Sequence, residues 1–187
     1  MSPIFARFFL GRLLFAVHEL EQLGGRILIA ELVEFLERNE NCAFCVHRFI
    51  RHDEVSSRVS VNPRCEIATE FALFTAAQLA RDNFIGNFSA CVYRREVIDR
   101  LDPTLFEMTV YDWMLNITVA QEGMIGYIPT IMSVYRAHPS GAWSGKTADE
   151  WRPELLELVD AYNKYLDFKF DAEFKVYKSA LLAEMQV

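Results

Sequence analysis

Residues 27–50, ILIAELVEFLERNENCAFCVHRFI, contain an amphipathic helix followed by a strand. From Ile27 to Arg38, the apolar residues at positions 28, 32, 35 and 36 fall on one helical face, and most charged residues fall on another. The polar residues 39–41 end this helix, and the run from Cys42 to Ile50 is typical of a strand. The pattern predicts a helix that leads directly into a strand.

The rest of the chain continues this alternation. We expect helices over Thr69–Asp82, Arg94–Leu101 and Val110–Glu122, strands over Asn83–Tyr93 and Met124–Tyr135, an exposed loop or hairpin end over Arg51–Ser60, and two helices between Asp149 and Met185 that separate near Phe170. A left-handed cap is expected at Gly123, and Pro129 indicates an edge position or a bulge. This order predicts the α/β class, with a mixed sheet flanked by helices.

The composition is that of a globular domain, with 187 residues of which 52% are hydrophobic and 24% charged. One domain over residues 1–187 is expected at this length. Within it we distinguish an apolar segment at 1–27, a core at 28–145 and a helical extension at 146–187. The formal net charge of −7 disfavours nucleic acid as a partner.

The four cysteines offer a possible C-x-x-C metal site at Cys42 and Cys45. On a regular strand, positions i and i+3 point to opposite faces, so two such thiolates could not share a zinc ion. We therefore expect small buried apolar side chains, with metal or redox use as the alternative. Free cysteines of this kind fit a reducing cytoplasm.

The apolar run Ile4–Val17 could be taken for a membrane or targeting segment. It is shorter than the roughly 20 residues needed to span a bilayer, and it contains Arg7 and Arg12. A signal peptide would carry its positive charge before the apolar core. Two alternatives stay open, namely a helix packed on the domain and an interfacial helix that makes a peripheral membrane contact through residues 4–17. The expected location is the cytoplasm or the membrane periphery.

Residues whose side chains could take part in catalysis or ligand binding concentrate between positions 111 and 143. Asp112 begins a predicted helix, and Arg136 and His138 follow the next predicted strand, where ligands bind in α/β sheets. A carboxylate there can accept a proton from a hydroxyl. Each residue also has a simpler interpretation: Asp112 as a helix cap, Arg136 as an ion-paired surface residue, and His138 as a turn residue.

Four segments occur in a recognisable order: LVEFLERN (32–39) with CAFCVH (42–47), FIGNFS (84–89) with YRR (93–95), YDW (111–113) with GMIGYI (123–128), and YRAHPSGAW (135–143). Together they resemble the second, acceptor-side half of a family-2 glycosyltransferase with the GT-A fold. The resemblance extends from Leu28 to Trp143, so that residues 28–145 are expected to form a glycosyltransferase-like core.

The resemblance implies an inverting transfer of sugar from a nucleotide-diphosphate donor to a glycan or lipid-linked acceptor. Asp112 stands at the position of the general base that deprotonates the acceptor hydroxyl. Asn87 and Trp113 would contact the acceptor side, Arg136 the donor diphosphate, and Trp143 would close over the substrates from a mobile loop.

A divalent metal ion, Mn²⁺ or Mg²⁺, is a further implication of the resemblance, with His138 as a ligand. Arginine and neutral imidazole have suitable chemistry for phosphate and for such ions.

The sequence departs from the family at its start, where the family has a nucleotide-binding half with a metal-binding D-x-D motif. Residues 1–27 contain no such motif, and Asp53-Glu54 lies at a position that does not match it. We therefore expect a chain that lacks this half. The alternatives are a partner-dependent fragment, a homo-oligomer, and a non-catalytic module that binds a partner through the helices after Asp149.

Overall fold

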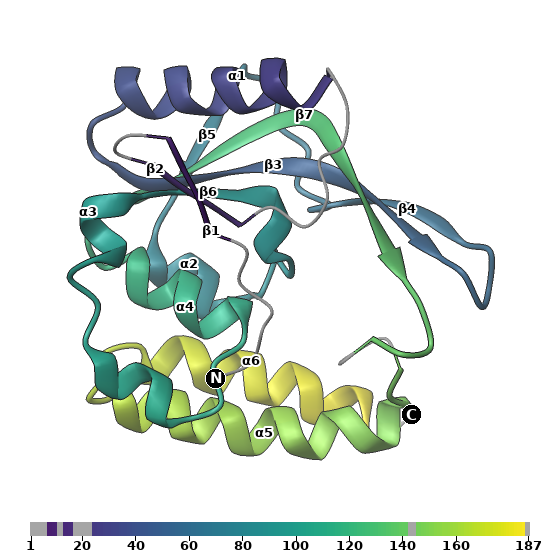
Figure 1. Ribbon diagram of the computed structural model, residues 1–187. Coiled ribbons are helices and arrows are strands. Elements are labelled where there is room, and N and C mark those ends of the chain that lie inside the picture. The colour runs from purple at the N-terminus through teal and green to yellow at the C-terminus, as the bar shows by residue number, and fades with distance from the viewer. Residues whose placement is uncertain (1–6, 11–12, 17–23, 142–144, 186–187) are drawn as a thin grey trace.

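The computed structural model describes residues 7–10, 13–16, 24–141 and 145–185 (Figure 1). The elements follow in the order β1 (Arg7–Leu10), β2 (Leu13–Ala16), α1 (Gly24–Arg38), β3 (Cys42–Asp53), β4 (Val59–Asn62), β5 (Ala72–Phe74), α2 (Ala76–Arg81), η1 (Phe88–Ala90), β6 (Cys91–Arg94), α3 (Arg95–Ile98), η2 (Pro103–Glu107), α4 (Asp112–Val119), β7 (Met124–Ala137), α5 (Ala148–Tyr165) and α6 (Asp171–Glu184). The expected α/β class, with a mixed sheet flanked by helices, is confirmed.

The sheet is organised around its two longest strands, β3 and β7. The strand order is β1-β2-β6-β3-β7-β5, and β4 pairs with the far part of β3 as a hairpin. β3 and β7 run parallel, whereas the other pairs are antiparallel. Because a parallel pair needs a crossover, the chain between β3 and β7 is free to supply helices to one face of the sheet.

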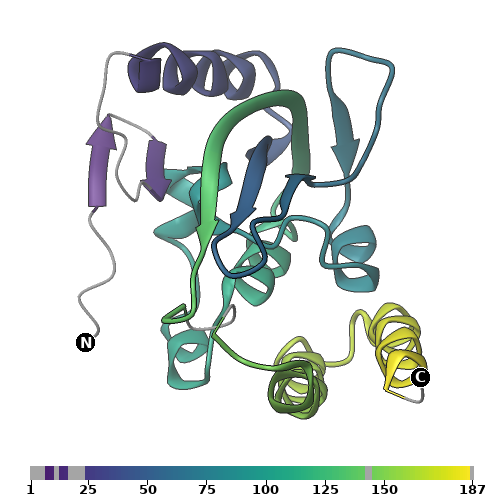
Figure 2. The same cartoon turned by 90° about the vertical axis from the view of Figure 1, so that its right-hand side faces the viewer.

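Helices cover both faces of this sheet. α1 lies on one face, and α2, α4, α5 and α6 lie on the other (Figures 1 and 2). The smaller apolar cluster joins α1 to the sheet through Leu32, Leu36, Cys45 and Ile128. The larger cluster contains buried side chains from all four helices of the opposite face. The expected amphipathic helix at 27–38 is therefore confirmed, with Leu36 fully buried.

The apolar N-terminal run is not helical where the structure describes it. β1 and β2 pair antiparallel, with Leu10 opposite Leu13, and β2 extends the sheet beside β6. At residues 7–10 and 13–16, the helix that both alternatives expected is therefore wrong. Gly11 interrupts the run and disfavours a helix, whereas the several phenylalanines suit strands.

The helix expected over Thr69–Asp82 is shorter than predicted. Ala72–Phe74 form β5 against β7, and α2 begins after Thr75. Thr75 fixes this start because its hydroxyl accepts the amide of Gln78, whose side chain accepts the amide of Thr75 in return. The capping box thus divides a periodic stretch into a strand and a short helix.

The strand expected over Asn83–Tyr93 is also shorter. Its first part has no regular structure, η1 follows, and β6 covers only Cys91–Arg94. The short helix expected after it is present as α3, and the helix expected at Val110–Glu122 is present as α4.

Gly123 precedes β7 but is not a left-handed cap, so that expectation is wrong. Among the described glycines, the positive φ belongs to Gly86. Gly123 is instead required by close approach, because a Cβ there would lie 2.7 Å from the carbonyl oxygen of Asn41 and 2.9 Å from the amide nitrogen of Ala43. It allows the starts of β3 and β7 to pack together.

A bulge in β7 contains Pro129, as the sequence indicated. His47 pairs with Ile128 and Arg48 with Ile131, so that two residues of β7 have no counterpart on β3. Beyond the bulge, β7 bends away from the sheet towards α5 (Figures 1 and 2).

Another register shift lies near the start of β3, between Cys42 and Phe44. It places Cys42 and Cys45 in the same apolar cluster, so the expectation of opposite faces is wrong because it assumed unbroken alternation. Both thiols are buried and free, as expected of small apolar side chains. Burial also raises the pKa of Cys45 well above its ordinary value, which disfavours a reactive thiolate.

The two C-terminal helices, α5 and α6, separate at residues 166–170 as predicted. They belong to the same core as the sheet, since Tyr162 and Phe174 pack edge-on against Trp113 of α4. Within the described ranges, no helix combines the length and the hydropathy needed to cross a membrane.

Candidate functional site

Asp112 lies at the start of α4, on the side of the sheet that the larger core covers (Figure 1). Its Oδ1 accepts the backbone amide of Trp113 at 2.8 Å, while the preceding N-cap residue, Tyr111, provides no side-chain cap. Asp112 is thus the first helical residue rather than the N-cap, but its carboxylate binds one of the free amides of the first turn, as a cap does. No described side chain donates a hydrogen bond to the carboxylate, so its bonds come from backbone amides.

Burial changes the acid–base behaviour of Asp112. Desolvation raises the pKa of this carboxyl, and hydrogen bonds from the backbone amides of Trp113 and of Asp112 itself oppose the rise only in part. A carboxylate with a raised pKa is a stronger base than an exposed aspartate. Asp112 can therefore cap its helix and also accept a proton.

A buried polar network lies beside Asp112. The hydroxyl of Tyr93, on β6, donates to Oδ1 of Asn116 at 2.5 Å, one helical turn beyond Asp112. Desolvation is the main cause that raises the pKa of Cys91 to about 12 and that of Tyr93 well above its ordinary value, and the charge of Asp112 adds to both shifts. The carboxylate is therefore close to Cys91 and Tyr93.

Asn87 lies next to this network, where η1 begins. Its Oδ1 accepts the amide of Ser89 at 3.0 Å and the hydroxyl of the same residue at 2.9 Å, and its carbonyl accepts the thiol of Cys91 at 3.5 Å. Its Nδ2 is buried and has no hydrogen-bond partner among the described residues. Asn87 thus contacts Cys91, whose pKa the charge of Asp112 also raises.

The segment before α4 is fixed by contacts to α5. Tyr111 donates from its hydroxyl to Glu154 at 3.0 Å, and Glu154 also pairs with Lys146. The hydroxyl of Tyr162 accepts the Tyr111 amide at 3.4 Å and donates to the carbonyl of Thr109 at 3.2 Å. These bonds hold the backbone next to Asp112 in position.

Trp113 is a core residue in the structure. It is 2% exposed, its Nε1 donates to the carbonyl oxygen of Leu79 at 2.7 Å, and its ring packs against Tyr162, Phe174 and Tyr177. The interpretation of Trp113 as an acceptor-contacting residue therefore has no geometric support, because the indole faces the helices behind the site. Its role is to anchor α4.

Arg136 lies in a different region from Asp112. Its side chain is 69% exposed and pairs with Glu54 at 3.2 Å, which is the simpler of the two sequence interpretations. Arg136 pairs with position 52 of β3, whereas Cys91 pairs with position 46. Six residues of extended strand correspond to roughly 20 Å. The structure does not bring Arg136 to Asp112.

His138 follows β7 directly and is partly buried, and its carbonyl accepts the amide of Gly141 at 3.0 Å, as in a turn. The prediction for Trp143 lies outside the described residues. The predicted site residues on this loop are thus only partly placed.

A divalent metal ion does not fit the described residues of this chain. No group of three or more His, Cys, Asp or Glu side chains gathers among them in a metal-binding arrangement. Asp53 is occupied by Arg51 and by Ser56, and Glu54 by Arg136. His138 would therefore be an isolated ligand, and one imidazole is a poor site for Mn²⁺ or Mg²⁺.

Sequence reasoning missed several polar residues near the site. Asn116 was detectable, since it follows Asp112 at the i+4 spacing that puts both on one helical face. The sequence around Tyr93 and Ser89 gave no indication of a role at this site, because their contacts depend on how η1 and β6 pack against α4. Arg48 was counted only as part of a strand.

The comparisons with known proteins give relatives but no family. No family model matches the chain. Uncharacterized proteins of Mycobacterium tuberculosis (strains H37Rv and CDC 1551) and of Mycobacterium bovis are each 31% identical over 121 residues. The alignment covers 65% of this chain and 33% of each relative, so the chain matches about a third of their length.

Proposed function

We propose that the chain is the acceptor-side part of an inverting glycosyltransferase, with Asp112 as the general base. The observation that carries the proposal is the environment of Asp112. A partly buried carboxylate of raised pKa lies at a helix start, and backbone amides rather than described side chains hold it. The resemblance of the surrounding segments to the GT-A fold selects sugar transfer among the reactions that a base can serve.

The proposed reaction needs one proton acceptor. Asp112 takes the proton of an acceptor hydroxyl while the hydroxyl oxygen attacks the anomeric carbon of the donor sugar. The new C–O bond forms as the bond from that carbon to the diphosphate oxygen breaks, and the nucleoside diphosphate leaves with the electron pair. The configuration at the carbon inverts. Proton transfer of this kind contributes about 10²–10⁴ in rate.

The side chains around Asp112 fit this role. The hydrogen bonds of Tyr111 to α5 hold the base in place, and the buried Nδ2 of Asn87 is a donor that an acceptor hydroxyl can satisfy. No step is assigned to a metal ion, because the described residues do not form a site for one.

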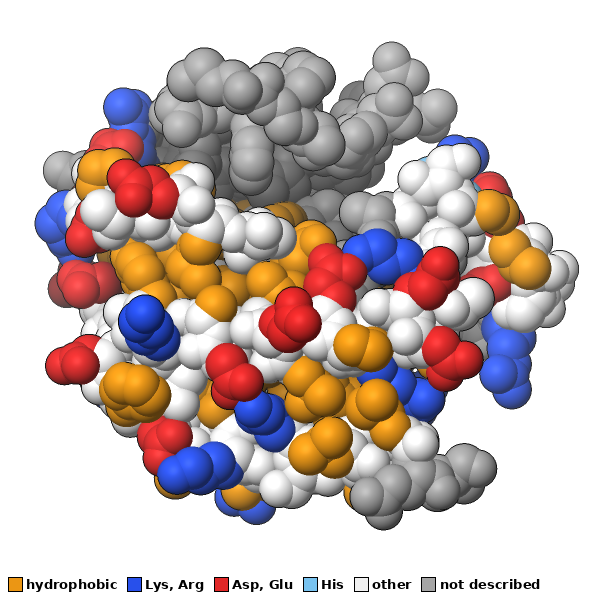
Figure 3. All heavy atoms as spheres, turned by 90° about the horizontal axis from the view of Figure 1, so that it is seen from below, with side chains coloured by type: hydrophobic (Ala, Val, Ile, Leu, Met, Phe, Trp, Pro, Cys, Tyr) orange, Lys and Arg blue, Asp and Glu red, His pale blue; other side chains and the backbone are white. Residues whose placement is uncertain are grey.

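The alternative of a non-catalytic module bound through α5 and α6 has less support. Most of the apolar residues after Asp149 pack on the chain's own core, including the fully buried Val159. On the outer face of these helices, charged side chains are interspersed with apolar ones (Figure 3). Val176 and Leu182 are each 44% exposed there, which is ordinary for single surface residues.

Ligand-dependent stabilisation tests the proposal before an acceptor is known. The chain is melted with UDP, GDP or dTDP, each with and without Mn²⁺. A nucleotide at 100 times its Kd stabilises the native state by about 2.7 kcal/mol. We expect one nucleotide to raise the melting temperature, and to do so equally in Asp112→Asn, because the base acts on the acceptor.

Two variants refine this experiment. If Arg136 or His138 contacts the donor, Arg136→Ala or His138→Ala abolishes the shift. A protein that melts cooperatively but shows no shift with any nucleotide would contradict donor binding by this chain and identify it as a fragment or a partner-dependent module.

A further inference from the structure

The partly buried arginines differ in their partners. Among the side chains that the structure describes, these arginines are Arg48, Arg51, Arg94 and Arg152. Arg51 and Arg152 each pair with a carboxylate, and Arg94 donates to three backbone carbonyls. The side chain of Arg48 has no hydrogen bond or ion pair with any described residue, and its Nε is buried without a partner. A half-buried charge without a partner is costly, and it calls for an explanation, of which a bound ligand is one.

A second unpartnered polar group lies on the neighbouring strand. Arg48 pairs with Ile131 of β7, and after a further register shift that leaves Met132 without a counterpart, Phe49 pairs with Ser133. Ile131 and Ser133 are two residues apart on β7 and therefore point to the same face. The hydroxyl of Ser133 is buried and also lacks a partner among the described residues. A guanidinium donor and a hydroxyl donor thus lie on adjacent strands, one register position apart, at the bulge of β3 and β7.

Both groups lie on the face of the sheet that carries Asp112. Phe49 packs edge-on against Tyr135 and belongs to the larger core, which α4 covers. Tyr127 belongs to the same core; burial raises the pKa of Tyr127, and the nearby charge of Arg48 opposes that rise. Because Arg48 pairs with Ile131, which shares a face of β7 with Ser133, its side chain lies on this same face of the sheet.

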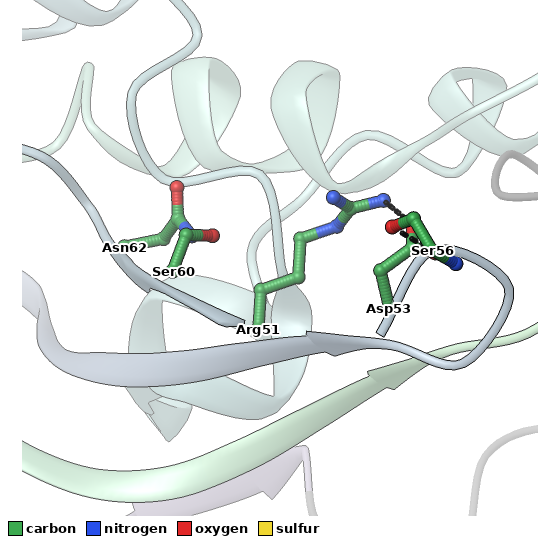
Figure 4. A network of polar contacts seen from close by, with 5 residues as sticks. All are labelled: Arg51, Asp53, Ser56, Ser60 and Asn62. Carbon is green, nitrogen blue, oxygen red and sulfur yellow. Dashed lines mark hydrogen bonds and ion pairs between the residues drawn. The ribbon is translucent and has the colours of Figure 1, made fainter. Parts of the chain in front are cut away.

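Arg51 continues this surface along the β3–β4 hairpin. Its side chain and those of Ser60 and Asn62 project from one face of the ribbon (Figure 4). One guanidinium nitrogen of Arg51 binds Asp53 at 3.2 Å, and Nδ2 of Asn62 donates to Ser60 at 2.9 Å. The ribbon adds a second positive charge close in sequence to Arg48, in a chain whose net charge is −7.

We propose that Arg48, together with the hydroxyl of Ser133, binds a phosphate group of a ligand under the bent part of the sheet, with Arg51 as a second cationic contact. A guanidinium presents paired N–H donors that match the oxygens of a phosphate, and the hydroxyl supplies a further donor. The ligand neutralises the charge that the fold leaves unpaired.

The identity of the molecule that carries the phosphate depends on the proposed function. The phosphate belongs either to the diphosphate of a nucleotide-sugar donor or to a lipid-linked acceptor. The binding chemistry is the same in both, so the first experiment uses inorganic pyrophosphate, which carries neither base, sugar nor lipid.

Calorimetric titration of the whole chain with pyrophosphate tests the site. Arg48→Gln should raise the dissociation constant roughly tenfold or more, because a charge-assisted contact to the phosphate is lost. Arg48→Lys should recover part of the affinity, since lysine is a point charge without the fork. The matched control is Arg58→Gln, which removes the same charge from the exposed turn of the same hairpin and should leave affinity unchanged.

A stability measurement distinguishes a variant that has lost the phosphate site from one that has lost its fold. Arg48→Met should melt at or above the temperature of the wild type without ligand, because an unpaired half-buried charge is removed, and pyrophosphate should no longer shift it. The proposal is overturned if the wild type binds no pyrophosphate at millimolar concentration, or if Arg48→Gln and Arg58→Gln weaken binding equally.

Two further titrations identify the source of the phosphate. Arg48-dependent binding that is tighter for UDP than for pyrophosphate assigns the site to the donor, and Arg48-dependent binding to phosphatidylcholine vesicles containing phosphatidic acid assigns it to a lipid phosphate. Pyrophosphate binding requires no transfer, and Asp112→Asn should retain it. Failure of sugar transfer and failure of the phosphate site are therefore separate results.

Discussion

The carboxylate of Asp112 has opposite effects on stability and on the proposed chemistry. Its pKa is raised in the folded state, so between its ordinary and its folded pKa the native protein binds more protons than the unfolded chain. The native state is therefore favoured by this group at low pH, and that contribution is lost as the pH rises through the folded pKa. An apolar side chain at this position would pack without the loss of stability that the ionised carboxylate causes at neutral pH.

Asp112→Asn should accordingly be as stable as the wild type or more stable at pH 7, and should lose that advantage towards pH 4. The amide oxygen of asparagine can still accept the Trp113 amide. Urea unfolding at several pH values measures the effect. A variant that is destabilised equally at every pH would contradict this account of the site.

Asp102 provides a control of opposite sign. Its carboxylate accepts the amide of Thr104, and this bond lowers the pKa of Asp102. Its contribution to stability is present above its ordinary pKa and is lost as the pH falls through the lowered folded pKa. Asp102→Asn should therefore be less stable than the wild type at pH 7, and the difference should disappear in acid.

Residue roles were easiest to predict from the sequence where they depend on the residue's position within its own helix or turn. Asp112 could be predicted as a candidate because a carboxylate at a helix start is visible in the sequence, and the ion-paired role of Arg136 was among the alternatives. The burial of Trp113 in the core could not be predicted, because its neighbours Leu79 and Phe174 are far from it in sequence. The unpartnered state of Arg48 depends on a bulge that only the pairing of β3 with β7 reveals.

At the scale of elements, close approach rather than backbone conformation explains the glycine at the start of β7. Gly123→Ala should cost about 1–3 kcal/mol, because its Cβ would meet backbone atoms that cannot move aside easily. Gly86 has a φ of +58° and no atom within 4 Å of a built Cβ, so Gly86→Ala should cost about 1 kcal/mol through conformation alone.

Denaturant unfolding of both glycine variants compares the two mechanisms. Gly123→Ala is expected to be the less stable protein of the two. The reverse order would show that the starts of β3 and β7 are not packed as described.

Long periodic elements were predictable, whereas short strands were not. α1, α5 and α6 each carry several turns of apolar periodicity, and their expected positions are confirmed. β5 has three residues and exists because β7 offers a partner, and β2 likewise depends on β6. Such strands are specified by tertiary pairing, and local sequence alone suggested helices at both places.

At the scale of the whole molecule, the C-terminal helices and the sheet share one core. Phe174 of α6 is 1% exposed and packs against Trp113, which anchors the helix that carries Asp112. Phe174→Ala should lower the free energy of unfolding by about 3–5 kcal/mol. The loss should appear equally in β3, so hydrogen exchange of the β3 amides should speed up with that of α6. Separate loss of protection in α6 alone would contradict a single cooperative core.

The central claim is that Asp112 acts as the base of a sugar transfer, and turnover tests it most directly. The chain is incubated with UDP-, GDP- and dTDP-sugars and a panel of glycan and lipid-linked acceptors, and release of the nucleoside diphosphate is followed. The account predicts acceptor-dependent release by the wild type and by Asp102→Asn, and a loss of about 10²–10⁴ in Asp112→Asn with nucleotide binding retained. Equal release by Asp112→Asn and the wild type, or no release by a wild type that binds the nucleotide, would contradict it.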